Sequence, residues 1–159
     1  MGEGKSRATI ARIAIQVTAI REPEVRRVDV FFYGLFMDEA LLREKGINPG
    51  NRRQAFVENF SLVIGARATM VPCIGKRVHG VVYSLTHDEI VTLYSEPSVS
   101  FYRPEAVFAK LADGSLIPAL CFTLPEIPLP DERNPDYAAK LKKLAERIGL
   151  PASYVSSIR

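Results

Sequence analysis

One carboxylate of this sequence lies in a setting that suits proton transfer. Glu96 follows a run with the apolar spacing of a helix and precedes the aromatic residues Phe101 and Tyr102. A free glutamate is a weak base at neutral pH. Partial desolvation raises the pKa of a carboxylate toward the pH at which general bases work best. Glu96 is therefore the candidate general base; the alternatives are a solvent-exposed side chain or an ion pair with Arg103. Glu105, beside a predicted strand, is a second and less favoured candidate.

A second segment has the pattern of a strand, a tight turn and a helix. Residues 28–32 alternate in the manner of a buried strand, which Tyr33-Gly34 ends. Asp38 then fits the N-cap of a helix that Gly46 would end. Such a turn leaves backbone N–H groups without partners, which favours an anion such as a carboxylate. The sequence therefore indicates either a carboxylate-binding turn or a simple connection.

Three further polar side chains could line a pocket. Arg67 could bind a substrate carboxylate through two hydrogen bonds, although an arginine on a solvent-facing strand is the simpler interpretation. Tyr83 and Tyr102 could offer their hydroxyls to a ligand, or pack in the core with the hydroxyls bonded to backbone groups.

The histidines and cysteines favour neither a metal site nor a nucleophile. The chain has 2 histidines and 2 cysteines, and no Cys or carboxylate stands at metal-ligand spacing from His79 or His87. Cys73 and Cys121 have apolar neighbours, which indicates buried, reduced thiols. We therefore expect no metal site and no Ser–His or Cys–His dyad.

Composition and charge describe an ordinary globular domain with an extension. Of 159 residues, 47% are hydrophobic and 25% are charged, which suits one core. Residues 1–27 hold six basic and three acidic residues and so carry the whole net charge of +3, because fifteen of each remain elsewhere. A neutral body argues against a nucleic-acid groove, and no apolar run is long enough to span a membrane. We interpret residues 1–27 as an extension of unknown role and residues 28–159 as the domain.

The remaining pattern predicts antiparallel strands with helices around them. Asp113-Gly114 is a hairpin signal, Thr86 and Glu89 form a capping-box motif, and Asn134 fits the N-cap of a later helix. These elements indicate an α+β domain, with a barrel as one arrangement. The expected strands are 55–64, 66–71, 78–85, 106–111 and 116–124, with a turn at 72–76, and the later helices are 87–94, 135–148 and 152–158.

Three of these segments together resemble the gamma-glutamylcyclotransferase-like family, of the AIG2-like or gamma-glutamylamine cyclotransferase type. They are Tyr33-Gly34 after a strand, Gly80-Val81-Val82-Tyr83 in a strand, and Glu96 followed six residues later by Tyr102-Arg103. The likeness covers residues 28–124, and the closing helices fit it. It implies a small mixed β-barrel flanked by helices, and an enzyme that releases 5-oxoproline from a γ-glutamyl amine, amino acid or peptide without a cofactor.

The resemblance also implies roles for particular residues. The N–H groups around Gly34 hold the α-amino acid end of the substrate, and Glu96 accepts a proton from the α-amine, which then attacks its own γ-carbonyl. The implied substrate-binding set is Tyr33, Gly34, Leu35, Phe36 and Tyr102.

The loop of this chain departs from the usual family pattern. That loop commonly reads Tyr-Gly-Ser-Asn-Met or Tyr-Gly-Thr-Leu, whereas Leu35 and Phe36 follow the glycine here. Backbone donors survive this change but side-chain hydroxyl and amide contacts do not, so we expect a more apolar pocket. Pro97 stands where a glycine often follows the catalytic glutamate, and it stiffens the chain beside Glu96.

The leading hypothesis is thus a cytoplasmic enzyme of this type, a monomer or homodimer, acting on a small γ-glutamyl substrate of the kind met in glutathione metabolism. One alternative is a non-catalytic small-molecule binding domain on the same scaffold. Another is a partner-binding module that uses the basic residues 1–27.

Overall fold

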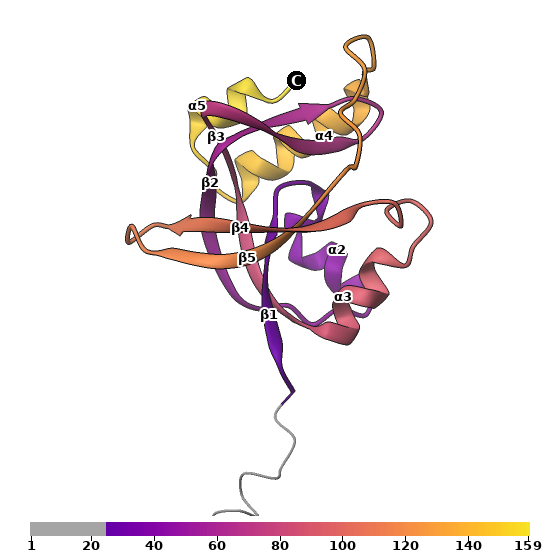
Figure 1. The fold of residues 1–159 in the computed structure, drawn as a ribbon, viewed down its shortest axis with the longest axis vertical. Helices are drawn as coiled ribbons and strands as arrows, with labels where there is room; N and C mark the ends of the chain where they lie inside the picture. The colour runs from indigo at the N-terminus through magenta and orange to yellow at the C-terminus, as the bar shows by residue number, and fades with distance from the viewer. Residues whose placement is uncertain (1–24) are drawn as a thin grey trace, which may run out of the picture.

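Five strands close into a mixed barrel in the computed structural model, which describes residues 25–159 (Figure 1). The strands are β1 (Arg27–Phe32), β2 (Gly50–Ile64), β3 (Ala68–Thr86), β4 (Arg103–Leu111) and β5 (Leu116–Thr123). Around the barrel the order is β1–β3–β2–β4–β5. Only the closing pair, β5 with β1, is parallel. The predicted fold class is confirmed.

Within residues 25–159, four α-helices and one short 3-10 helix lie outside the barrel. Figure 1 shows α4 and α5 beside the β2–β3 hairpin, with α3 near the opposite end. None of the helices in residues 25–159 is long and apolar enough to cross a membrane. The helices are η1 (Leu35–Met37), α2 (Glu39–Glu44), α3 (His87–Tyr94), α4 (Pro135–Arg147) and α5 (Ala152–Ser157).

Helices α2, α3 and α4 begin at the caps that the sequence predicts. The Asp38 carboxylate caps α2, and the Asn134 side chain caps α4 by accepting the Tyr137 N–H at 3.1 Å. Thr86 and Glu89 form a reciprocal capping box at the start of α3, with hydrogen bonds of 2.9 and 3.1 Å. Side chains that accept N–H groups of the first turn explain why α2, α3 and α4 start where they do.

One predicted turn is wrong, because β3 runs through residues 72–76 without reversing. The register with β2 shifts between Glu58 and Phe60, so extra residues of β3 bulge outward. Gly75 has a φ of 84° there and donates its N–H to Asn59 Oδ1 at 3.1 Å. Proline and glycine mark a bulge as readily as a turn, which is why the sequence pattern was ambiguous.

The other chain reversals follow the predictions. The β2–β3 hairpin turns at Gly65, although β2 begins earlier than expected, at Gly50. Gly114, with a φ of 86°, joins β4 to β5. β1 starts at Arg27, and residues 1–24 of the expected extension lie outside the described residues.

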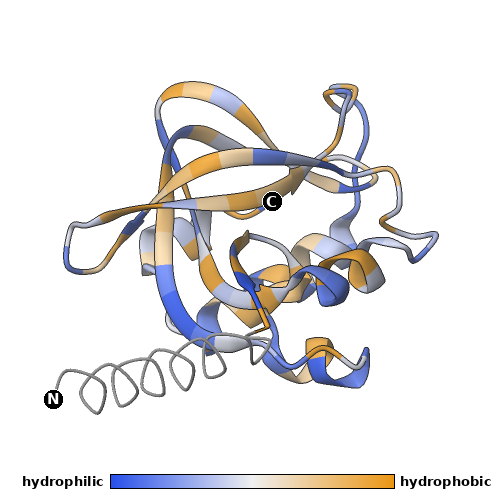
Figure 2. Cartoon of the chain, turned by 60° about the horizontal axis from the view of Figure 1, so that its bottom comes forward, coloured by the Kyte–Doolittle hydropathy of each residue, from blue (hydrophilic) through white to orange (hydrophobic). Residues whose placement is uncertain are grey.

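β1 is buried on both of its faces. Phe31 belongs to a core cluster with residues from all five strands, which is the barrel interior, whereas Val30 and Phe32 pack in a second cluster with the helices. Gly80 of β3 permits this packing, since an added Cβ would lie 2.2 Å from the Phe32 carbonyl oxygen. Figure 2 shows hydrophobic residues recurring along the barrel strands and hydrophilic ones at the hairpin tips.

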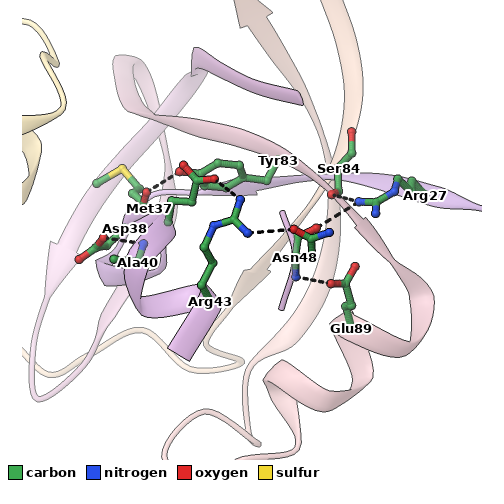
Figure 3. Close-up of polar contacts among 10 residues, drawn as sticks. Arg27, Met37, Asp38, Ala40, Arg43, Asn48, Tyr83, Ser84 and Glu89 are labelled. Atoms are coloured by element: carbon green, nitrogen blue, oxygen red, sulfur yellow. Dashed lines mark hydrogen bonds and ion pairs between the residues drawn. The ribbon is translucent and has the colours of Figure 1, made fainter. Parts of the chain in front are cut away.

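A polar cluster around Asn48 holds α2 and α3 against the barrel (Figure 3). The Asn48 carbonyl accepts from Arg27 at 3.3 Å, and its side-chain oxygen accepts from Arg43 of α2 at 3.0 Å. The Asn48 N–H donates to the carboxylate of Glu89 in α3. These bonds fix the two helices relative to each other and to β1.

Removal of the Glu89 carboxylate should loosen this cluster. Partial burial raises the pKa of Glu89, but hydrogen bonds from the Thr86 and Asn48 N–H groups lower it by more. The net result is a pKa below the usual value of 4.5. We expect Glu89→Ala to lower the free energy of unfolding at pH 7 by about 1–2 kcal/mol, and Glu89→Gln, which keeps an acceptor, to lower it less. Because the pKa of Glu89 is lowered in the folded protein, its stabilising effect is full above pH 4.5 and is lost as the pH falls through the folded-state pKa. The difference in unfolding free energy between Glu89→Ala and the unaltered protein should therefore shrink in acid.

Urea unfolding followed by circular dichroism measures these differences, and Asp88→Ala in the exposed first turn of α3 is the control. Equal stabilities of Glu89→Ala and Asp88→Ala would contradict the role given to Glu89.

Candidate active site

The carboxyl end of β1 opens into a cavity of about 360 Å³. Its wall comes from the turn after β1, the β2–β3 turn, the end of β5, helices α2 to α4 and the loop after α3. The fold therefore brings together segments that lie far apart in the sequence. All six residues that the sequence analysis assigned to the site line this cavity: Tyr33, Gly34, Leu35, Phe36, Glu96 and Tyr102.

The turn after β1 presents its backbone to the cavity. The Gly34 carbonyl accepts the Met37 N–H at 3.0 Å and so closes η1. Within residues 25–159 the Phe36 N–H has no hydrogen-bond partner. A donor left open beside a cavity can bind a ligand oxygen, as the sequence analysis expected for this turn.

Tyr137 of α4 packs directly against this turn. An added Cβ on Gly34 would lie 2.6 Å from the Tyr137 hydroxyl oxygen, so a larger residue at position 34 would have to displace that side chain. Burial raises the pKa of Tyr137 to about 12; Tyr102 adds to the rise and the Leu35 N–H, which faces the phenol oxygen, opposes it. The first turn of α4 thus forms part of the cavity wall and offers a protonated hydroxyl.

Glu96 forms an ion pair with Lys45, the residue that ends α2. Lys45 Nζ lies 2.7 and 2.9 Å from the two carboxylate oxygens and 5.9 Å from the centre of the Phe36 ring. The Glu96 side chain is 37% exposed, so it is less desolvated than expected, and its partner is not Arg103. The ion pair therefore holds the Lys45 ammonium beside the carboxylate at the cavity wall.

The hydroxyls of Tyr33 and Tyr102 are both engaged by the backbone. Tyr33 donates to the Phe122 carbonyl at 2.6 Å, and Tyr102 donates to the Ala68 carbonyl. Burial raises the pKa of both phenols, so they stay protonated at neutral pH. These two tyrosines therefore shape the cavity and tie it to β3 and β5.

Stacked aromatic rings make up much of the remaining wall. Tyr94 lies parallel to Phe122, with ring centres 3.7 Å apart, and meets Phe36 edge-on at 6.0 Å. Burial raises the pKa of Tyr94 as well. Aromatic and aliphatic side chains, Leu35 and Phe36 among them, therefore form much of the cavity wall.

Arg67 lies in the turn between β2 and β3 rather than on a strand. It is exposed, as the simpler interpretation held, but it also lines the cavity. Its guanidinium carbon stands 3.9 Å from the centre of the Phe101 ring, and one N–H donates to the Ser98 carbonyl. The side chain is therefore held at the rim by two contacts.

Two residues weighed from the sequence lie elsewhere. Tyr83 donates its hydroxyl to the Met37 carbonyl at 2.9 Å and packs in the core. Glu105 accepts a hydrogen bond from the Thr123 hydroxyl at 3.1 Å and does not line the cavity.

The cysteine and metal expectations concern other parts of the structure. Burial raises the pKa of the Cys121 thiol to about 12, and the charge of Glu105 adds to the rise. Within residues 25–159 there is no group of three or more His, Cys, Asp or Glu that could hold a metal ion.

Sequence reasoning missed several residues of the cavity wall. Lys45 falls in the helix predicted between Asp38 and Gly46, and no spacing rule joins it to Glu96, which follows a later predicted helix. Tyr137 falls in the predicted helix 135–148, which gives no sign of a contact with the turn at Gly34. The missed residues that contact the predicted ones are Lys45, Tyr94, Phe122 and Tyr137.

A sequence model of the family described as "Gamma-glutamyl cyclotransferase, AIG2-like" matches residues 30–141. This range spans more than half of the chain and contains all the predicted site residues. The chain belongs to this family. Membership of the AIG2-like cyclotransferase family supports a cyclotransferase-type function, and the family acts on small γ-glutamyl compounds. A comparison with curated proteins finds no significant match.

Solved structures share the fold of this AIG2-like family member. A structure titled "Gamma-glutamyl cyclotransferase" has a TM-score of 0.70 at 18% identity, and covers 84% of this chain and 89% of its own. The uncharacterized human protein loc79017 has a TM-score of 0.67 at 19% identity, covering 84% and 88%. YkqA from Bacillus subtilis has a TM-score of 0.68 at 21% identity, covering 82% of this chain and 52% of its own. These likenesses establish the barrel fold.

Gly34→Ala should force the turn and α4 apart. The new Cβ would crowd the Tyr137 hydroxyl, and we expect a loss of about 1–3 kcal/mol in the free energy of unfolding. Tyr137→Phe removes the crowding oxygen, so the double variant should recover most of that loss. Urea unfolding of the two single variants and the double variant gives the coupling energy. Gly50→Ala, whose Cβ would meet nothing closer than 3.4 Å, is the control; strictly additive losses would show that the contact is absent.

Proposed function

We propose that this protein releases 5-oxoproline from small γ-glutamyl compounds by intramolecular cyclisation. The observation that supports this most is that Glu96 and the turn from Gly34 to Phe36 line one cavity, although far apart in the sequence. The cavity, at about 360 Å³, lies within the range of small-molecule sites.

The proposed reaction needs one base and a folded substrate. Glu96 takes a proton from the substrate α-ammonium, and the neutral nitrogen attacks the γ-carbonyl carbon to form the ring C–N bond. The ring nitrogen gives up a second proton as the bond from that carbon to the leaving amine breaks. The amine departs as an ammonium with both protons, one of them returned by Glu96, which regenerates the carboxylate. All atoms of the substrate are shared between 5-oxoproline and the amine, so no water, oxidant or reductant is consumed.

The cavity supplies what such a substrate needs at its α-amino acid end. The open Phe36 N–H and the Lys45 ammonium are donors for the α-carboxylate, and Glu96 next to Lys45 then faces the α-amine. The aromatic wall favours a folded conformation of the bound substrate over an extended conformation that is exposed to water. Because the nucleophile and the carbonyl belong to one molecule, holding them in contact corresponds to an effective concentration of about 10⁵–10⁸ M.

A non-catalytic binding domain on the same scaffold is the second candidate. The observation that favours it is the Lys45–Glu96 ion pair, which engages the proposed base. Under this candidate, γ-glutamyl compounds would raise the melting temperature without being converted. We also propose a cytoplasmic location and a monomeric or homodimeric state; Cys73 and Cys121 are both free, which fits a reducing compartment.

Glu96→Gln should abolish turnover while leaving binding intact. The amide keeps the size of the side chain but accepts no proton, so we expect kcat for 5-oxoproline release to fall by about 10²- to 10⁴-fold. Release is measured by chromatography or proton NMR, and binding by calorimetry with a γ-glutamyl dipeptide. Glu105→Gln, which changes a carboxylate outside the cavity, is the control and should retain full activity. Undiminished release by Glu96→Gln would refute the role of Glu96 as the base.

A further inference from the structure

The charged side chains of the cavity are unequal in sign. Among the described residues that line it, two are cationic and one is anionic: Lys45, Arg67 and Glu96. A γ-glutamyl amino acid carries two carboxylates and one ammonium at neutral pH, so its net charge is opposite to that of the cavity. A γ-glutamyl derivative of a simple alkylamine carries one of each and matches the cavity less well.

The two cations belong to separate parts of the wall. Lys45 lies at the end of α2, paired with Glu96 and near the Phe36 ring. Arg67 lies in the β2–β3 turn, above the Phe101 ring and bonded to the Ser98 carbonyl. Lys45 is therefore placed with the groups proposed to hold the α-amino acid end, and Arg67 is not.

Arg67 is also prepared to bind a planar anion. Its contacts with Phe101 and Ser98 hold the side chain at the rim, which reduces the entropy lost when a ligand binds. A guanidinium has five N–H donors, and the Ser98 carbonyl engages only one of its nitrogens. The other nitrogens can bind a carboxylate through two parallel hydrogen bonds, a geometry that lysine cannot reproduce.

We propose that Arg67 binds a carboxylate on the leaving amine, so that the preferred substrates are γ-glutamyl α-amino acids rather than γ-glutamyl alkylamines. This inference rests on the proposed function and adds the class of the amine that is released. Arg67 is thus the specificity-determining residue for the leaving group, while Glu96 and the turn after β1 act on the glutamyl part that all substrates share.

Two substrates that differ only by the carboxylate test this assignment. γ-L-Glutamyl-L-alanine and γ-L-glutamyl-ethylamine have the same γ-amide and the same two-carbon leaving group, apart from that carboxylate. We expect the unaltered protein to show a kcat/KM for 5-oxoproline release about 10- to 100-fold higher with the alanine compound. Arg67→Ala should remove this preference by lowering kcat/KM for the alanine compound alone, mainly through KM, and Arg67→Lys should restore it in part.

Arg103→Ala is the matched control, because Arg103 is exposed, bonds nearby carbonyls of the same loop and does not line the cavity. It should leave both substrates unaffected. Equal kcat/KM values for the two substrates, or an equal loss for both in Arg67→Ala, would overturn the assignment of Arg67 while leaving the cyclotransferase function standing. No release from either substrate would overturn the proposed function and this inference with it.

Discussion

The enclosure of β1 is the constraint on which the site depends. The strand pairs with β3 along one edge and with β5 on the other, and the side chains of Val30, Phe31 and Phe32 are at most 3% exposed. If β1 shifted by one residue relative to its neighbours, every side chain that points into the barrel would point toward the helices, and the reverse. The register of β1 is therefore strongly specified. The turn at Gly34 therefore inherits its position from the barrel, and the Tyr33 hydroxyl bonded to the Phe122 carbonyl fixes it further.

The proposed base depends on a second set of contacts that lie away from the cavity. Lys45 ends α2, and Glu96 follows α3 by two residues. The Asn48 cluster joins these two helices through Arg43 and Glu89. The distance between the ammonium and the carboxylate is thus set by helix docking as well as by their own attraction, which is modest for a pair that is 25% and 37% exposed.

Local signals in the sequence predicted local features well. Asp38, Asn134 and the Thr86–Glu89 box cap the helices as expected, because a cap acts within one turn of the chain. The strand that ends at Tyr33-Gly34 was also predictable, since burial and glycine leave a strong pattern. The family resemblance then placed Glu96 beside that turn.

Features that arise from distant contacts were beyond the sequence pattern. The bulge at Gly75 uses the residues of a turn, and only pairing with Asn59 shows that β3 continues. Tyr137 follows Gly34 by about a hundred residues, and its contact with the turn exists only because α4 packs there. The Lys45–Glu96 ion pair likewise forms only because the ends of α2 and α3 lie close together. The local sequence of neither helix predicts this contact.

A crystal structure of Glu96→Gln with γ-L-glutamyl-L-alanine would show directly whether residue 96 faces the α-amine of the substrate. We expect the dipeptide in the cavity at the end of β1, with its α-amino nitrogen within hydrogen-bond distance of residue 96 and its α-carboxylate against the Phe36 N–H and Lys45. A dipeptide bound outside this cavity, or bound with its amino group turned away from residue 96, would contradict this expectation.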